Sequence, residues 1–165
     1  MKKLFLIIIL ICLESCSRIG NQSEDFAIID CPDVYFSAES NIYLDSKNKD
    51  LDLDNVNYKA SLNNHAFNNE CITNQNLNIY NLDVLIITEP INAENEYINL
   101  PLFALLYDSE NTLIDRQYFR INNILKSNRE NYSYKITDII GNLNIIVNKD
   151  QEISSITIGF VQLNY

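Results

Sequence analysis

The chain has few of the residues that enzymes and metal sites commonly use. It contains no tryptophan, a single histidine (His65), three glycines and four cysteines in 165 residues. One imidazole is too few for a histidine-based zinc site, and any nucleophilic triad would have to use it. The three glycines, at positions 20, 141 and 159, cannot form a glycine-rich phosphate loop. The composition therefore argues against an enzyme and indicates no cofactor.

Basic residues are also scarce, with 12 lysines and arginines against 22 acidic residues and a net charge of −10. A nucleic-acid partner is excluded on this ground, because binding to phosphate backbones needs a basic surface. The hydrophobic fraction of 47% is ordinary for a folded protein and too high for a disordered one. The length fits one domain.

The apolar run at the amino terminus is short. Residues 4–13 are apolar, follow Lys2 and Lys3, and would span about 15 Å as a helix, half of a bilayer core. This pattern is typical of a secretory signal peptide rather than a permanent transmembrane helix. We therefore expect residues 1–15 to be a cleaved signal peptide.

The run ends in Leu13-Glu14-Ser15-Cys16. This tetrapeptide resembles the lipobox of bacterial lipoproteins, although Glu14 stands where a small or apolar residue is usual. The resemblance implies that Cys16 carries a diacylglycerol group, is acylated at its new amino terminus and anchors the chain to a membrane, since two or three acyl chains give stable anchoring. Cys12 lacks the small residue before it and is the poorer candidate. An ordinary cleaved signal or an uncleaved anchor is the alternative.

Ser17 follows the lipobox cysteine. By resemblance to the sorting rule of Gram-negative lipoproteins, the absence of aspartate there favours the outer membrane, with the domain facing the periplasm. We expect residues 16–28 to hold the lipidated cysteine and a flexible polar linker, and residues 29–165 to form the domain. An acidic domain of this kind is repelled by an anionic bilayer surface.

The remaining cysteines are Cys31 and Cys71. Export places them in an oxidising compartment, where two cysteines of one domain most simply pair. Such a disulfide closes a loop of about forty residues and stabilises the domain by a few kcal/mol. A pair of buried free thiols is the alternative.

The body of the chain shows period-two patterns of β-branched and aromatic residues. They predict strands over residues 34–38, 58–62, 77–87, 100–107, 112–121, 132–136 and 156–163. Residues 108–111 are turn formers, which makes 100–121 a hairpin, with Pro101 at the start of its strand or on an unpaired side. In the last strand we expect Gly159 at a bulge or a close approach.

Residues 137–147 fit a strand, a short helical turn or a loop. No segment carries a sustained helical stripe. About seven short strands predict an all-β fold, a β-sandwich of immunoglobulin-like architecture, with an open barrel as the alternative.

A family resemblance rests on Cys31-Pro32, the Tyr58-Lys59-Ala60 strand, Cys71, and the LPLFALLYDSENTLIDRQYF hairpin that starts at Leu100. These features, with the lipobox and the closing IGFVQL, resemble a group of small alphaproteobacterial envelope lipoproteins of unknown function. Val161 departs from the group's Gly-Phe-Gln-Leu ending. The resemblance implies a lipoprotein with a disulfide and a sandwich fold, and it implies no activity.

Three polar segments are candidate sites. His65 lies in a polar, loop-like stretch and is expected at the surface. Residues 50–54 carry alternate aspartates but lack the glycine and glutamate of an EF-hand, and residues 89–96 carry three glutamates without a tryptophan sugar platform. Each is more simply a solvated loop. The sequence thus predicts a lipid-anchored envelope domain that binds an unidentified envelope protein or has a structural role; a small-ligand or calcium-binding module is the alternative, and a hydrolase comes last.

Overall fold

The computed structural model describes residues 26–46, 53–94, 96–127 and 134–162. These residues form ten β-strands and one short 3-10 turn, η1 (Leu53–Asn55). The strands are β1 (Ala27–Ile29), β2 (Asp33–Phe36), β3 (Ile42–Ser46), β4 (Val56–Phe67), β5 (Cys71–Thr73), β6 (Leu77–Pro90), β7 (Tyr97–Tyr107), β8 (Leu113–Ile124), β9 (Thr137–Asn148) and β10 (Ser155–Phe160). Within these ranges there is no helix long and apolar enough to cross a membrane.

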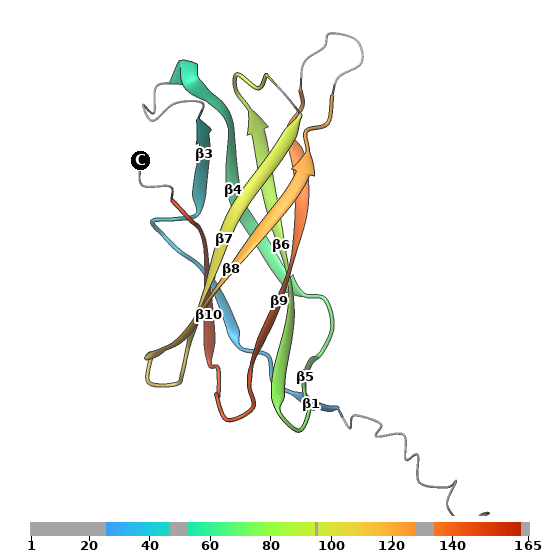
Figure 1. The fold of residues 1–165 in the computed structure, drawn as a ribbon, viewed down its shortest axis with the longest axis vertical. Coiled ribbons are helices and arrows are strands. Elements are labelled where there is room, and N and C mark those ends of the chain that lie inside the picture. The colour runs from blue at the N-terminus through green and yellow to red at the C-terminus, as the bar shows by residue number, and fades with distance from the viewer. Residues whose placement is uncertain (1–25, 47–52, 95, 128–133, 163–165) are drawn as a thin grey trace, which may run out of the picture.

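The strands make two packed sheets (Figure 1). The first sheet has the order β1-β5-β6-β4-β3, and β9 pairs with the other side of β6. The second sheet has the order β2-β10-β7-β8, in which β2 and β10 run parallel and the other pairs are antiparallel. The predicted all-β sandwich is therefore confirmed, while the immunoglobulin-like detail stays a prediction.

The core forms where the inward faces of the two sheets meet. In β6 and β9 every second residue is buried, because successive side chains of a strand point to opposite faces. The alternation buries aliphatic side chains from both sheets together with the rings of Tyr43, Tyr58, Tyr80 and Phe160. The largest fully buried side chains are Leu82, Ile86, Ile98, Leu100, Leu102, Leu106, Leu125, Ile139, Leu143, Ile145, Ile156 and Phe160.

The predicted hairpin is β7 and β8. Its turn is organised by Asp108, whose carboxylate accepts hydrogen bonds from the main-chain N–H groups of Glu110 at 2.9 Å and Thr112 at 2.8 Å. Pro101 lies inside β7, and its carbonyl accepts a hydrogen bond from Val161 just beyond the end of β10. The main-chain groups of Pro101 therefore face away from β8, so its missing N–H costs the hairpin no hydrogen bond.

Several strands differ from the sequence prediction. Residues 137–147, for which the sequence left a strand, a helical turn or a loop open, belong to β9, which pairs with β6 over its whole length. β1, β3 and β5 have three to five residues each, too few for a periodic pattern to show. β1 begins at Ala27, within the residues expected to form the linker. The strand predicted over residues 132–136 is wrong in its described part, where Tyr134 makes one isolated bridge to Ser127.

Candidate functional site

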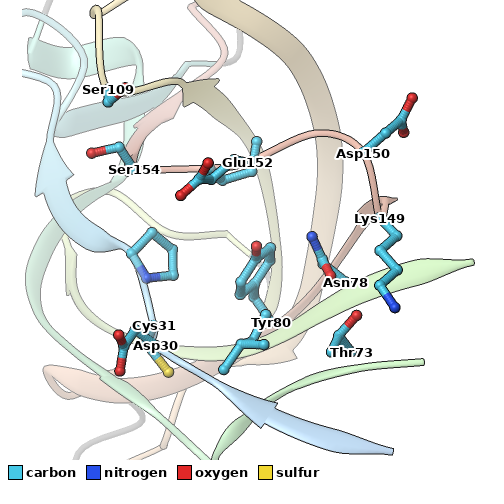
Figure 2. Close-up of a pocket in the computed structure, with 13 residues that line it drawn as sticks. Asp30, Cys31, Thr73, Asn78, Tyr80, Ser109, Lys149, Asp150, Glu152 and Ser154 are labelled. Carbon is cyan, nitrogen blue, oxygen red and sulfur yellow. The ribbon is translucent and has the colours of Figure 1, made fainter. Parts of the chain in front are cut away.

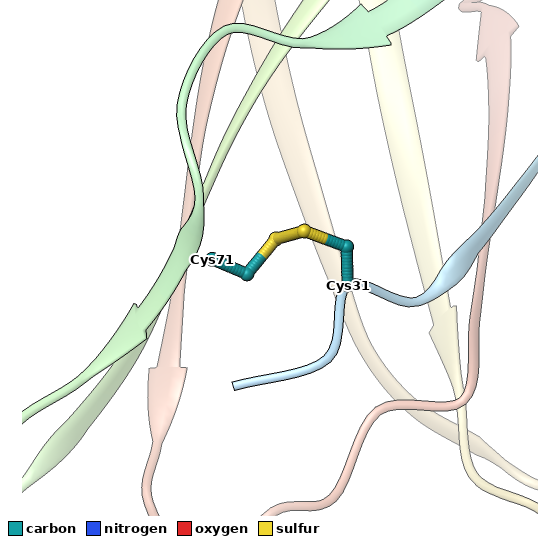
Figure 3. Close-up of a disulfide and its surroundings, with 2 residues drawn as sticks. All are labelled: Cys31 and Cys71. Carbon is teal, nitrogen blue, oxygen red and sulfur yellow. A yellow bond between two sulfur atoms is a disulfide. The ribbon is translucent and has the colours of Figure 1, made fainter. Parts of the chain in front are cut away.

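The predicted disulfide between Cys31 and Cys71 is present (Figure 3). Cys71 is the first residue of β5 and is fully buried, whereas Cys31 lies where the chain crosses from β1 in one sheet to β2 in the other. Their Cα atoms are 5.3 Å apart. The bond pins this crossing to the first sheet, so its role is structural.

The other predicted sites lie partly outside the described residues. Cys16, Cys12 and the aspartates at positions 50 and 52 are among the residues that the structure does not describe, so lipidation at Cys16 stays a prediction. Asp54 lies in η1 and is exposed. Within the described ranges, no group of three histidine, cysteine, aspartate or glutamate side chains is placed to hold a metal ion.

His65 does not lie in a loop, and its predicted surface position is only partly correct. The chain bulges after Leu62 and then continues β4 through His65, which is half-buried. The imidazole packs edge-on against the ring of Phe36 in β2, with centroids 5.5 Å apart. His65 therefore contributes to the contact between the two sheets, because β4 and β2 belong to different layers.

The three glutamates near Pro90 are not equivalent. Glu89 lies in β6 and pairs with Lys59 of β4 across the ladder, with 3.2 Å between Nζ and Oε2. Glu94 and Glu96 are exposed between β6 and β7. Both partners of the Lys59–Glu89 pair are partly exposed to solvent, so this surface ion pair contributes little to stability.

A cavity of about 590 Å³ opens at the end of the sandwich where β1 enters (Figure 2). Sequence reasoning missed it, because its wall comes from four separate segments of the chain. They are the disulfide segment, β5 with the start of β6, the β7–β8 turn and the loop after β9. The lining residues of this end cavity are Ile29, Asp30, Cys31, Pro32, Thr73, Asn78, Tyr80, Ser109, Lys149, Asp150, Glu152, Ile153 and Ser154.

Tyr80 is the most deeply buried polar side chain that lines the end cavity. Burial raises the pKa of its hydroxyl, the Asn78 side chain lowers it, and the negative charge of Glu152 raises it again. Asn78 is also buried, and its amide donates to the Gln151 carbonyl at 3.3 Å. The hydroxyl thus stays protonated at neutral pH and offers a hydrogen bond beneath a polar, mainly acidic rim.

A second candidate is the outward face of the second sheet. Register places Tyr118 of β8 beside Phe103 of β7, and Phe103 beside Gly159 of β10. The Phe103 ring lies over Gly159 so closely that a Cβ there would come within 2.8 Å of Phe103 Cε1. The close approach predicted for Gly159 is therefore confirmed. A shallow pocket of about 230 Å³ lies beside this ring.

Two arginines flank the aromatic side chains on this face. The Arg116 guanidinium donates to the Tyr118 hydroxyl at 3.4 Å, and Arg120 follows two residues later on the same side of β8. No ion pair among the described residues neutralises either arginine. Tyr118 is 62% exposed. We call this surface the aromatic face; it comprises Tyr35, Phe103, Arg116, Tyr118 and Arg120.

Comparison of the chain with protein-family models, with curated proteins and with solved structures finds no match in any of the three. The function must therefore be argued from the residues themselves.

Proposed function

We propose that this protein is a lipid-anchored lipoprotein of the bacterial envelope, whose β-sandwich faces the periplasm and binds a protein partner. Acyl groups on Cys16 hold it at the outer membrane, and residues 17–26 link the anchor to β1. Anchoring confines the domain to a membrane surface, which raises its effective concentration near partners held at the same surface.

The aromatic face is the observation that carries the interaction role. Tyrosine, phenylalanine and arginine are enriched at protein interfaces, and tyrosine and arginine are among the residues that contribute most of the binding energy. Here Tyr35 is 55% exposed and Tyr118 62% exposed, and both lie on one side of one sheet.

The charge of the aromatic face indicates the kind of partner. Arg116 and Arg120 form a local positive spot on a chain with a net charge of −10. Guanidinium groups bind carboxylates in a bidentate geometry that lysine does not match. We therefore assign this face to an acidic segment of an envelope protein.

Site-specific photo-crosslinking in cells tests the proposal. Benzoylphenylalanine in place of Tyr118 should give a discrete cross-linked band, and the same residue in place of Ile42, which is 46% exposed on the other sheet, should not. Reversing charge with Arg116→Glu/Arg120→Glu should reduce the Tyr118 band at least fivefold. Equal bands from both positions, or a band that ignores the charge reversal, would refute this role for the aromatic face.

The end cavity favours a second function, the binding of a small ligand. Its volume of about 590 Å³ suits a small molecule, and Asp30, Asp150 and Glu152 make its rim acidic. An organic amine matches that charge, and its ammonium group can donate to the Tyr80 hydroxyl oxygen. Putrescine is a suitable probe: it should raise the thermal midpoint in a concentration-dependent way, and Glu152→Gln should remove the shift. No shift at millimolar putrescine would exclude an amine.

A further inference from the structure

β9 is an edge strand of unusual regularity. Its twelve residues pair with β6 without a register shift, and no other described strand is hydrogen-bonded to its second edge. Exposed edges are commonly protected by lysine, proline or a bulge. β9 contains none of these, and Asp138 is its one charged residue. The edge is therefore open to another strand.

The main-chain groups on this edge belong to the even-numbered residues. The carbonyl of Ile146 accepts a hydrogen bond from the Gln117 side chain of β8 at 2.8 Å, whereas Lys149 donates back to Asn76 beside β6. In an antiparallel ladder the N–H and C=O of one residue point to the same side. The groups of Ile140, Asn142 and Asn144 thus face outward with that of Ile146.

The outward side chains of β9 have a symmetrical order. From residue 138 to residue 148 they are Asp, Ile, Asn, Asn, Ile and Asn. Antiparallel pairing of two copies centred on Leu143 sets Ile140 opposite Ile146 of the second copy, and Asn142 opposite Asn144 of the second copy. A shift of the centre by one residue either way places isoleucine opposite asparagine or aspartate. Of these three registers, only the one centred on Leu143 sets isoleucine opposite isoleucine and asparagine opposite asparagine.

In one copy, rows of side chains on the outer face of the first sheet end at β9. In the same register these rows continue onto the sheet of the second copy. Ile28, Ile72, Ile79 and Ile146 form one continuous row across the outer face of the first sheet. In the pairing this row meets Ile140 of the second copy, which lies beside Leu85 of that copy. A second row contains Asp83 and Asn142, whose side-chain amide donates to the Asp83 carboxylate within one copy. In the pairing this row meets Asn144 of the second copy. Matched cross-strand pairs of this kind stabilise sheets.

Charge permits the pairing even though the protein is acidic. Asp138 comes opposite Asn148 of the second copy, and Lys149 of that copy follows next in the chain. No like charges meet across the two strands. Gln117 does not block the edge, because a carbonyl oxygen has a second lone pair for a partner N–H.

We propose that the protein forms a symmetric dimer in which β9 of two copies pairs antiparallel about Leu143, so that the two first sheets become one continuous sheet. The contact is isologous, since each copy offers the same strand. It uses neither the aromatic face nor the lipid, so it stands apart from the proposed function.

Introducing charged residues at Ile140 and Ile146, which are 62% and 40% exposed, tests the dimer. Two differently tagged full-length chains are expressed together, and co-purification after detergent extraction is measured. Wild-type chains should co-purify. The Ile140→Lys/Ile146→Lys chain should co-purify with itself at least tenfold less, and so should the Ile140→Glu/Ile146→Glu chain, because like charges then oppose each other. The lysine chain with the glutamate chain should recover the wild-type yield.

The recovery distinguishes pairing from a loss of folding, since two unfolded chains would not restore each other. A matched control, Ile42→Lys/Ile91→Lys, adds the same charge at two exposed positions outside β9 and outside the isoleucine row, and it should keep the wild-type yield. Adding Cys16→Ser to every chain should leave the pattern unchanged, which separates the dimer from the anchor. Wild-type chains that do not co-purify, or a mixed pair no better than either variant alone, would overturn the proposal.

Discussion

The hydroxyl of Tyr58 hydrogen-bonds both main-chain groups of Asn99. Tyr58 reaches from β4 in the first sheet to β7 in the second, where its Oη donates to the Asn99 carbonyl at 3.2 Å and accepts from the Asn99 N–H at 3.1 Å. β10 ends at Phe160, opposite Leu102, and no other described strand pairs with this edge of β7 at Asn99. One side chain therefore satisfies both main-chain groups and links the two sheets.

Removing this hydroxyl should destabilise the fold. Tyr58→Phe keeps the ring but leaves the N–H and C=O of Asn99 without their partner, which costs about 1–3 kcal/mol of unfolding free energy. Urea denaturation measures the loss. Tyr35→Phe removes an exposed hydroxyl and should change the unfolding free energy by less than about 0.5 kcal/mol. Equal effects of the two substitutions would contradict the bridging role of Tyr58.

Stability should fall in alkaline solution because of the same tyrosine. Burial raises the pKa of Tyr58 well above its ordinary value of 10.0; its contact with Asn99 lowers it, and the Asp45 carboxylate raises it further. Above about pH 10 the unfolded chain releases this proton while the folded chain keeps it, so deprotonation favours unfolding. The stabilisation is thus complete below pH 10 and is lost as pH rises beyond it.

Burial also raises the pKa of Tyr80, so loss of its proton in alkaline solution likewise favours unfolding. Unfolding free energies measured between pH 8 and pH 11.5 should decline beyond pH 10. Tyr58→Phe should reduce the slope. An unchanged slope in Tyr58→Phe would show that other groups dominate the alkaline loss.

The disulfide should make a large contribution to stability. Cys31 and Cys71 are 40 residues apart in the chain, and closing a loop of that length stabilises the fold by about 4 kcal/mol in the chain-entropy model. Cys31→Ala/Cys71→Ala should lose roughly that amount in urea denaturation. Reductant should destabilise the wild type similarly and the double variant hardly at all; a loss below about 1 kcal/mol would contradict the role assigned to the bond.

Two threonines that face each other across β6 and β9 should respond oppositely to the same change. Thr88 is fully buried, and its hydroxyl has no partner among the described residues. Thr137 is also buried, but its hydroxyl accepts from Lys126 N–H and donates to the Lys135 carbonyl, each at 3.0 Å. Thr88→Val should stabilise the fold by about 1 kcal/mol, whereas Thr137→Val should cost about 1–3 kcal/mol. Denaturation midpoints that shift in the same direction for both would contradict this assignment.

The features that the sequence predicted are those with a local cause. The β7–β8 hairpin follows from a continuous apolar strand and the turn chemistry around Asp108, all within one short segment. The last strand, predicted over residues 156–163 and observed as β10, follows from the period-two pattern alone. The Cys31–Cys71 bond follows because only two cysteines remain in the expected domain.

The features that escaped prediction depend on contacts between distant segments. The end cavity exists because the disulfide brings the crossing after β1 beside β6 and the loop after β9. β9 alternates well, but Gly141 and its asparagines dilute the pattern. Its burial depends on packing under β8, where Ile121 covers Gly141. Such contacts cannot be read from one strand at a time.

Acyl labelling of the cells tests the central claim most directly. The full-length chain and its Cys16→Ser variant are expressed with a clickable palmitate analogue, and label and membrane fractionation are compared. Our account predicts a labelled, membrane-bound wild type and an unlabelled Cys16→Ser chain, with Cys12→Ser behaving as the wild type. Equal labelling of the wild type and Cys16→Ser, or a wild type recovered unlabelled in the soluble periplasmic fraction, would contradict it.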